Sequence, residues 1–382
     1  MSEKIESEGL LERLGVKYYR SLFKKANINE IASFDIDDLP PDETLQALVE
    51  NITLFAAIIA FTIGVLTTIV SVWFELEYKD QLETVTYYLL YISVVITMLV
   101  IELSVLYWLG LKTVYSISCL TGHHRTIDGS LPGDDSIANI LSRAALEIPD
   151  PVVDYLGIDP LKHISKSKLL FVGLLYKAKV VFSGLVVKFI LVRMFGKGGL
   201  RFDMVWVSVP VTGIWDAFTI YKVAREARLR LFGNRLAQYM VDSIMQPEII
   251  DNLSPKTREG AIRAVANMMV LTQNYHPNML VLLVKLSDTF EVKQGCDYDD
   301  WDEFLQLLEE VPDKERYFLL DLLCIAAAFD GQLSRLERYH LPQAFKEYTD
   351  VYMLRIEKLT HCLLTGQLHA AKLLCQLDFE PG

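Results

Sequence analysis

The sequence lacks every short motif by which a hydrolytic or nucleotide-dependent active site would be recognised. It contains no GxSxG, no GxGxxG after a strand, no phosphate-binding P-loop and no HExxH. The glycine-rich residues 196–199 lack the spacing of a P-loop, and His123 and His124 have no carboxylate at helical spacing to complete a metal site. We therefore predict that the protein is not an enzyme and needs no cofactor, and that the histidine pair lies in a surface loop.

Cysteine and positive charge are also scarce. The cysteines, which form no CxxC and no zinc-type Cys/His spacing, are Cys119, Cys296, Cys324, Cys362 and Cys375. Such a set is typical of reduced thiols in a cytosolic environment. The net charge of −12 excludes nucleic acid as the main partner, because a basic surface is expected there. Residues 1–15 are charged and contain no apolar stretch, so we expect no cleavable signal peptide.

Apolar residues are abundant instead, at 52% of the chain, and they gather in long runs. Residues 52–74 carry no charge, and a helix of this length spans a hydrocarbon core of about 30 Å. Small residues recur at every fourth position and predict a face for close helix packing: Ala56, Ala60, Gly64 and Thr68. Trp73, at the end of the run, suits an interfacial aromatic belt.

A second apolar run covers residues 85–109 and follows the short acidic link 75–83. Two runs joined this closely are predicted to form an antiparallel hairpin. Basic residues flank the hairpin on both outer sides, whereas the link has only Lys79. The positive-inside rule therefore predicts that the link lies outside and that both chain termini are cytoplasmic.

A second candidate hairpin covers residues 168–222. Its first arm, 169–195, is apolar but contains Lys177, and its second arm, 204–221, contains Asp216. We predict that this hairpin also spans, giving about four spans in all. A hairpin that dips into one leaflet, or a soluble amphipathic pair, is the open alternative.

Three ionisable residues of these runs are predicted to share one depth. Counted from the cytosolic ends, Glu102, Lys177 and Asp216 lie about 10, 12 and 9 Å into the core. Charges inside a membrane usually face the bundle interior and pair with one another. Three interpretations are open: an ion or proton path, a structural ion pair, or a protonated Glu102 whose pKa is raised by desolvation.

The N-terminal residues 8–26 have apolar side chains at helical spacing, with Lys17, Arg20, Lys24 and Lys25 among them. This pattern predicts a basic amphipathic helix that lies either on an anionic membrane surface or against another soluble segment.

Residues 223–382 have the apolar periodicity of helices throughout and no alternating strand pattern. Ser254 is predicted to cap a helix that begins at Pro255, and Gly331 is predicted to end another. We expect a cytosolic all-α domain of about 150 residues, long enough for its own core.

The Asp-Gly segment of this domain resembles a calcium loop only in part. In that comparison Asp330 takes position 5 and Glu337 position 12, but positions 1 and 3 are Ala326 and Ala328, which offer no side-chain oxygen. Metal binding at Asp330 and Glu337 is therefore not expected. The simpler prediction is a helix–turn–helix in which Ser334 caps the second helix.

Two segments resemble known families. An alanine-rich helix ending in Asp-Gly, then a hydrophobe, Ser and Glu, resembles the tellurite-resistance B-like domains; the matching residues are Ala326, Ala327, Asp330, Gly331, Leu333, Ser334 and Glu337. That resemblance implies an all-helical domain, often fused to membrane segments, that responds to stress or metals, with Asp330 and Glu337 at the acidic positions. The second acidic cluster of such a site is missing at residues 312–314. Residues 204–233 resemble the membrane-associated hairpin of bacterial EcsC-like proteins.

The sequence as a whole predicts an all-α membrane protein with two helical hairpins and a C-terminal soluble helical domain. The expected parts are an N-terminal cytosolic helix and linker, a first hairpin, a cytosolic connector, a second hairpin and a cytosolic domain: 1–50, 51–109, 110–167, 168–222 and 223–382. The expected function is that of a membrane-anchored binding or regulatory scaffold, or stress sensor, whose partners are the lipid bilayer and a protein. A small ion or solute transporter built on Glu102, Lys177 and Asp216 is the alternative. The chain looks like an uncharacterised multi-span protein of the bacterial inner membrane, and an oligomer is compatible with it.

Overall fold

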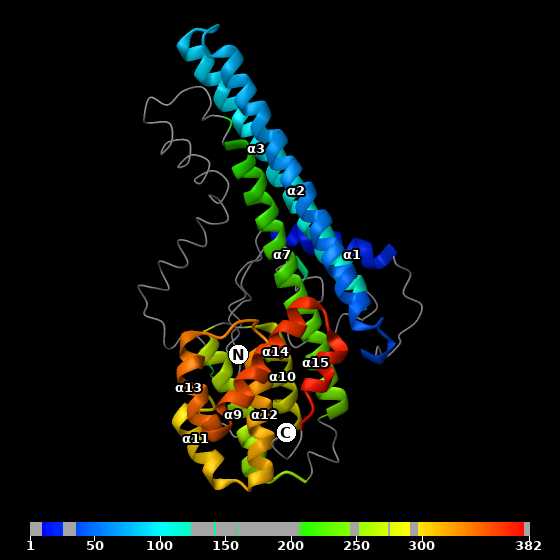
Figure 1. Cartoon of the computed structure of the whole chain (residues 1–382), viewed down its shortest axis with the longest axis vertical. Coiled ribbons are helices and arrows are strands. Elements are labelled where there is room, and N and C mark those ends of the chain that lie inside the picture. The colour runs from blue at the N-terminus through cyan, green and yellow to red at the C-terminus, as the bar shows by residue number, and fades with distance from the viewer. Residues whose placement is uncertain are drawn as a thin grey trace. The chain divides into compact units, whose positions relative to one another are not determined.

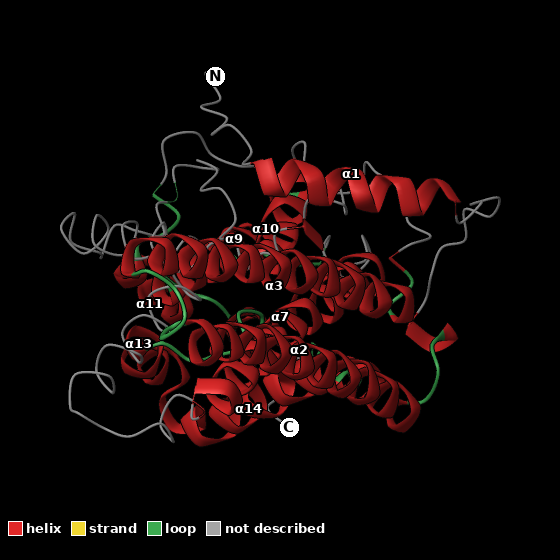
Figure 2. Cartoon of the chain, turned by 90° about the horizontal axis from the view of Figure 1, so that it is seen from above, coloured by secondary structure: helices red, strands yellow, loops and turns green. Residues whose placement is uncertain are grey.

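The computed structural model describes residues 10–25, 36–123, 141–142, 158, 206, 208–244, 252–273, 276–290 and 297–377. Every regular element of this part is a helix and none is a strand, which confirms the predicted all-α class (Figure 1, Figure 2). The elements are α1 Leu10–Lys25, η1 Ile36–Asp38, α2 Asp42–Tyr78, α3 Thr84–Leu120, α7 Ser208–Tyr239, η4 Met240–Ile244, α9 Pro255–Thr272, α10 Pro277–Thr289, α11 Trp301–Glu310, α12 Asp313–Ala328, α13 Arg335–Phe345, η5 Lys346–Tyr348, α14 Thr349–Thr365 and α15 Leu368–Leu374.

The chain divides into two compact units. One, called here the helical domain, comprises Met1–Glu50, Tyr115–Ile164 and Arg225–Gly382, and the other, the hairpin unit, comprises Asn51–Val114 and Ser165–Ala224. Each of α2, α3 and α7 contributes residues to both units.

The hairpin unit is built on α2 and α3, which run antiparallel, with the first half of α7 beside them (Figure 1). Both α2 and α3 are long and apolar enough to cross a membrane. Their apolar residues pack on α7 in a small core made of Ala56, Ala60, Leu109 and Ile220.

The link of this hairpin is shorter than predicted, because α2 continues through Tyr78 and α3 begins at Thr84. The ring of Tyr78 packs on Phe74 with centroids 4.8 Å apart, and the Lys79 ammonium lies 3.9 Å from the Glu75 carboxylate. Contacts between residues four apart extend a helix by one turn. At its other end α3 passes residue 109 and reaches Leu120, because residues 111–120 contain no proline or glycine to stop it.

The predicted second hairpin is described only in its second arm. Its first arm, with Lys177, lies outside the described residues. The second arm begins α7 at Ser208, but α7 is not among the helices long and apolar enough to span. Four spans therefore stay a prediction, whereas two helices meet the requirement.

The core of the helical domain is formed by α9 and α12, which pack against each other and against α10, α11, α13 and α14. Residues 260–272 of α9 and 318–328 of α12 are buried without interruption. A helix that is buried all round lies at the centre of its domain.

The helix ends of this domain form as predicted. The hydroxyl of Ser254 accepts a hydrogen bond from the amide of Thr257, and Pro255 opens α9. Gly331, with a φ of 76°, lies in the turn after α12, where a left-handed backbone favours glycine. Ser334 and Glu337 form a reciprocal capping box at the start of α13.

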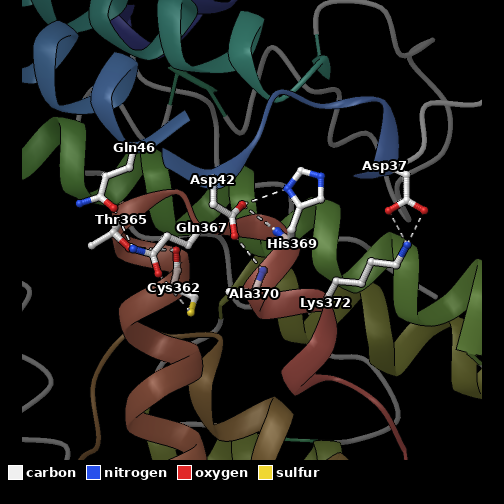
Figure 3. A network of polar contacts seen from close by, with 9 residues as sticks. All are labelled: Asp37, Asp42, Gln46, Cys362, Thr365, Gln367, His369, Ala370 and Lys372. Atoms are coloured by element: carbon white, nitrogen blue, oxygen red, sulfur yellow. Dashed lines mark hydrogen bonds and ion pairs between the residues drawn. The ribbon is translucent and has the colours of Figure 1, made fainter. Parts of the chain in front are cut away.

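The start of α2 and the preceding η1 are tied to the C-terminal helix α15 (Figure 3). The carboxylate of Asp42 accepts hydrogen bonds from the amides of His369 and Ala370, each at 2.9 Å, and lies 3.0 Å from Nδ1 of His369. Gln367 donates to Gln46 at 2.8 Å, and Lys372 pairs with Asp37 at 2.7 Å. These contacts join residues more than 300 positions apart inside the helical domain.

Candidate functional site

A layer of buried polar groups crosses the interior of the hairpin unit. The Thr67 hydroxyl on α2 donates a hydrogen bond of 2.6 Å to Oε2 of Glu102 on α3. Glu102 is only 2% exposed, although the helix around it is apolar. The glutamate that stands out in the sequence therefore lies inside the unit and contacts a hydroxyl of the neighbouring helix.

The second carboxyl group of the layer belongs to α7. Asp216 is 4% exposed and lies directly against Gly64, where an added Cβ would stand 2.3 Å from Oδ2. No residue larger than glycine fits at this position without displacing Asp216. Gly64 and Thr67 are one helical turn apart, about 4.5 Å along α2, so both carboxyl groups contact the same turn.

The predicted small face of α2 lies along the same side. Ala56, Ala60 and Thr68 are buried, and Oγ1 of Thr68 has no hydrogen-bond partner within the described part of the chain. Gly213 is a small residue on the α7 side of this contact, and a Cβ added there would stand 2.9 Å from the ring of Phe61 on α2. Small residues on both helices permit this close approach, as they do in tightly packed helix pairs.

The outward surface of the hairpin unit is apolar. Only 6% of the most apolar window of α3 is buried, and 33% of that of α2. The exposed large apolar side chains include Leu54, Phe55, Ile58, Leu66, Val85, Leu89, Ile92, Ile96 and Val100, joined on α7 by Ile214 and Phe218. Monomeric soluble proteins rarely expose so many large apolar side chains on neighbouring helices.

Aromatic and basic side chains bound this apolar surface. Near the link, the ring centroids of Trp73 and Tyr78 lie 6.1 Å apart, and those of Tyr87 and Tyr91 lie 5.7 Å apart. At the other end, Nζ of Lys112 lies 5.0 Å from the ring centroid of Trp108, and Nζ of Lys222 lies 4.7 Å from the ring centroid of Phe218. Long basic side chains beside aromatic rings are typical of a membrane–water boundary.

The helical domain buries a different pair of acids, at the corner between α12 and α13. Oδ1 of Asp330 accepts from the amide of Gln332 at 3.1 Å, and Oε2 of Glu337 accepts from that of Ser334 at 2.6 Å. Oε1 of Glu337 is buried without a hydrogen-bond partner among the described residues. Burial raises the pKa of Asp330 to about 7, and burial together with the charge of Asp330 raises that of Glu337 to about 8. At neutral pH this pair therefore holds a proton.

Side chains of α7 and α10 face this acidic corner. Arg225 donates to the carbonyl of Gly331 at 3.3 Å, and Arg230 pairs with Glu226 at 2.7 Å. Burial opposes the charge of Glu226, but the positive charges of Arg230 and Arg225 hold its pKa below the ordinary value. Burial lowers the pKa of His276 to about 3, so that this imidazole is neutral.

The sequence offers Asp330 and Glu337 as candidate metal ligands. Within the described part of the chain, no group of three or more His, Cys, Asp or Glu side chains is arranged to hold a metal ion. The two acids match the resemblance to tellurite-resistance B-like domains in sequence, whereas their contacts are those of a turn and a helix cap. Proton sharing is the chemistry that these residues support.

One prediction about the histidine pair is wrong. His123 is buried in the helical domain, where Nδ1 lies 2.7 Å from the hydroxyl of Thr121 and Nε2 lies 3.1 Å from Oδ1 of Asn234. These partners satisfy both ring nitrogens, which makes burial of the imidazole affordable. His124 lies outside the described residues.

The predicted polar layer includes Glu102 and Asp216 but not Thr67. Glu226 and His276, which lie beside the acidic corner, are also not predicted from the sequence. A hydroxyl one turn from Gly64 on the small face is the sequence feature that points to Thr67. No such feature links Glu226 to the acidic corner, because His276 and Asp330 come from distant segments.

No family model, no curated protein and no solved structure matches the chain. The two resemblances found in the sequence therefore stay predictions, and the function must be argued from the residues.

Proposed function

We propose that the chain is a membrane-anchored regulatory protein, held in the bilayer by its hairpin unit and binding a protein partner through its helical domain. The apolar outward surface of α2 and α3 carries this proposal, because water would have to solvate nearly all of the α3 run. Lipid is the environment in which such a surface is stable.

The boundary residues support the same proposal. Rings gather at the link end and lysine–aromatic pairs at the other, as expected for two opposite interfaces. The chain is then multi-pass with both termini cytoplasmic, because basic residues outnumber those of the link on both flanks. The resemblance to EcsC-like proteins favours the bacterial inner membrane.

A paired crosslinking experiment tests anchoring and partner binding separately. A photoreactive phenylalanine replaces Ile92, 52% exposed on α3, or Leu354, 50% exposed on α14 of the helical domain. Irradiation of whole membranes should attach lipid at position 92 and one defined protein at position 354. Position 358 on α14, exposed and basic, serves as the neighbouring control.

Two outcomes would overturn the proposal. Release of the intact chain from membranes by alkaline carbonate would remove the anchor. Crosslinking of lipid alone at position 354, with a folded domain, would remove the partner.

A second candidate function, the movement of protons or small cations through the hairpin unit, is favoured by one observation. Glu102 and Asp216 are buried at the same turn of α2, in a unit that otherwise exposes apolar side chains. In proteoliposomes, Glu102→Gln and Asp216→Asn should then abolish flux, whereas Asp80→Asn in the exposed link should leave it unchanged. Absence of flux in the parent protein would reject this candidate.

A further inference from the structure

The N-terminal helix α1 directs its basic side away from the protein. Val16 and Tyr19 are buried, whereas Leu14 of the same helix is 49% exposed. Arg13, Lys17 and Arg20 are exposed on the other side. Packing against another segment, one of the two predictions for this helix, accounts for its buried apolar residues. It does not account for its exposed basic residues.

The charge of α1 is opposite in sign to that of the whole chain. Its residues Leu10–Lys25 include five basic side chains and one acidic side chain, Glu12, whereas the chain as a whole carries −12. No ion pair within the described part of the chain involves Arg13, Lys17 or Arg20. This face is therefore available to an anionic surface.

The position of α1 along α3 identifies that surface. Tyr18 lies close enough to Tyr115 to contribute, after burial and Cys119, to the raised pKa of that phenol. Tyr115 follows the end of the apolar run at Leu109 by about 9 Å along the same helix. The headgroup region extends about 5–8 Å beyond each side of a hydrocarbon core that is about 30 Å thick, so Tyr115 lies at its outer edge.

We propose that Arg13, Lys17 and Arg20 bind anionic lipid headgroups on the leaflet from which the C-terminal end of α3 emerges. This inference rests on the proposed membrane anchoring of the hairpin unit and adds the lipid class and the residues that contact it. The main attraction is electrostatic, since Val16 and Tyr19 of α1 are already buried.

Amide hydrogen exchange of the full chain in nanodiscs tests the proposal. Exchange in α1 should be slower in discs that contain phosphatidylglycerol than in discs of phosphatidylcholine alone, by on the order of tenfold. High salt should remove this difference, because exposed charges are then screened. The triple variant Arg13→Gln, Lys17→Gln and Arg20→Gln should exchange equally fast in both discs.

A matched variant controls for loss of positive charge. Lys285→Gln, Lys314→Gln and Lys358→Gln remove three exposed lysines of the helical domain and should preserve the lipid dependence of α1. Exchange in α1 that is equal in both lipids would overturn the proposal, as would protection that appears only on adding a soluble protein fraction. Either result leaves carbonate-resistant anchoring intact, so a failure here is distinct from a failure of the proposed function.

Discussion

The helical domain and the hairpin unit each contain a pair of buried carboxyl groups close to each other, but different partners accommodate the two pairs. In the helical domain, Asp330 and Glu337 accept hydrogen bonds from backbone amides of their own turn. In the hairpin unit, Glu102 accepts from a hydroxyl of another helix, and Asp216 lies against the bare backbone of Gly64. Local chain geometry thus holds the first pair, and the packing of three helices holds the second.

The two units should therefore be sensitive to different kinds of substitution. The helical domain has a continuous apolar core in α9 and α12, so we expect its weak points to be charges left without partners. The hairpin unit has few buried apolar residues, so we expect it to depend on close helix contacts at small side chains.

The largest effect is expected from an ion pair of the helical domain. Arg355 pairs with Asp321, which is nearly fully buried, and also donates to the carbonyls of Leu374 and Gln376 at 2.9 and 2.7 Å. Arg355→Met leaves the Asp321 charge buried without its partner and should lower the free energy of unfolding by about 3–5 kcal/mol. Amide exchange of α12 and α14 measures this loss.

The exposed pair Arg316–Asp313 is the matched control. Its atoms lie 2.6 Å apart, but the side chains are 34% and 76% exposed. Arg316→Met should cost at most about 1 kcal/mol. Equal losses in the two variants would show that burial does not set the value of charge pairing in this domain.

The second prediction concerns the pH dependence of the helical domain. The pKa values of Asp330 and Glu337 are raised to about 7 and about 8, so the folded state binds more protons than the unfolded state above pH about 4. The free energy of unfolding should therefore fall as pH rises from about 4 to about 8, by on the order of 3 kcal/mol, and then level off.

Glu337→Gln tests the source of that slope. A glutamine can keep the hydrogen bond to the Ser334 amide, because capping boxes accept either residue, but it does not titrate. Unfolding of the variant, followed between pH 4 and 8, should show a clearly reduced slope. A slope as steep as that of the parent would show that Glu337 is not its source. Glu226 and His276 could not supply it, because their lowered pKa values give a slope of the opposite sign.

The third prediction tests packing in the hairpin unit. Gly64→Ala adds a Cβ at 2.3 Å from Oδ2 of Asp216 and 3.1 Å from the carbonyl of Thr212. The overpacked contact should destabilise the unit by about 1–3 kcal/mol in thermal unfolding in detergent. Thr62→Ala, on the exposed side of α2, is the control and should have little effect.

A second substitution identifies the cause. Asp216→Ala placed in the Gly64→Ala chain removes the atoms that collide and should restore at least half of the loss. Losses that simply add would show that the glycine is needed for another reason.

How much of this could be predicted from the sequence depends on how local each feature is. Ser254, Gly331 and Ser334 form the predicted helix ends, because capping is decided by a few adjacent residues. The apolar runs predict α2 and α3 for a similar reason, since length and composition suffice. That Glu102 and Asp216 contact the same turn of α2 agrees with the count along their helices.

The partners of the buried groups could not be predicted in this way. The contact of Thr67 with Glu102 depends on how α2 and α3 are rotated about their axes, which no single run specifies. The surface loop is predicted for His123 because no carboxylate follows it at helical spacing, whereas its partner Asn234 comes from α7. Such contacts follow from packing between distant segments.

The smallest expected effect lies where the two ends of the helical domain meet. Asp42→Ala removes the acceptor for the amides of His369 and Ala370, which begin the short helix α15. Loss of an aspartate that caps a helix costs about 1 kcal/mol, and faster amide exchange in α15 would report it. Asp37→Ala removes an ion pair with Lys372 in which the Asp37 side chain is 62% exposed, and it should leave that exchange unchanged. If both variants speed up amide exchange in α15 equally, the attachment of this helix depends on surface charge and not on hydrogen bonds to its backbone amides.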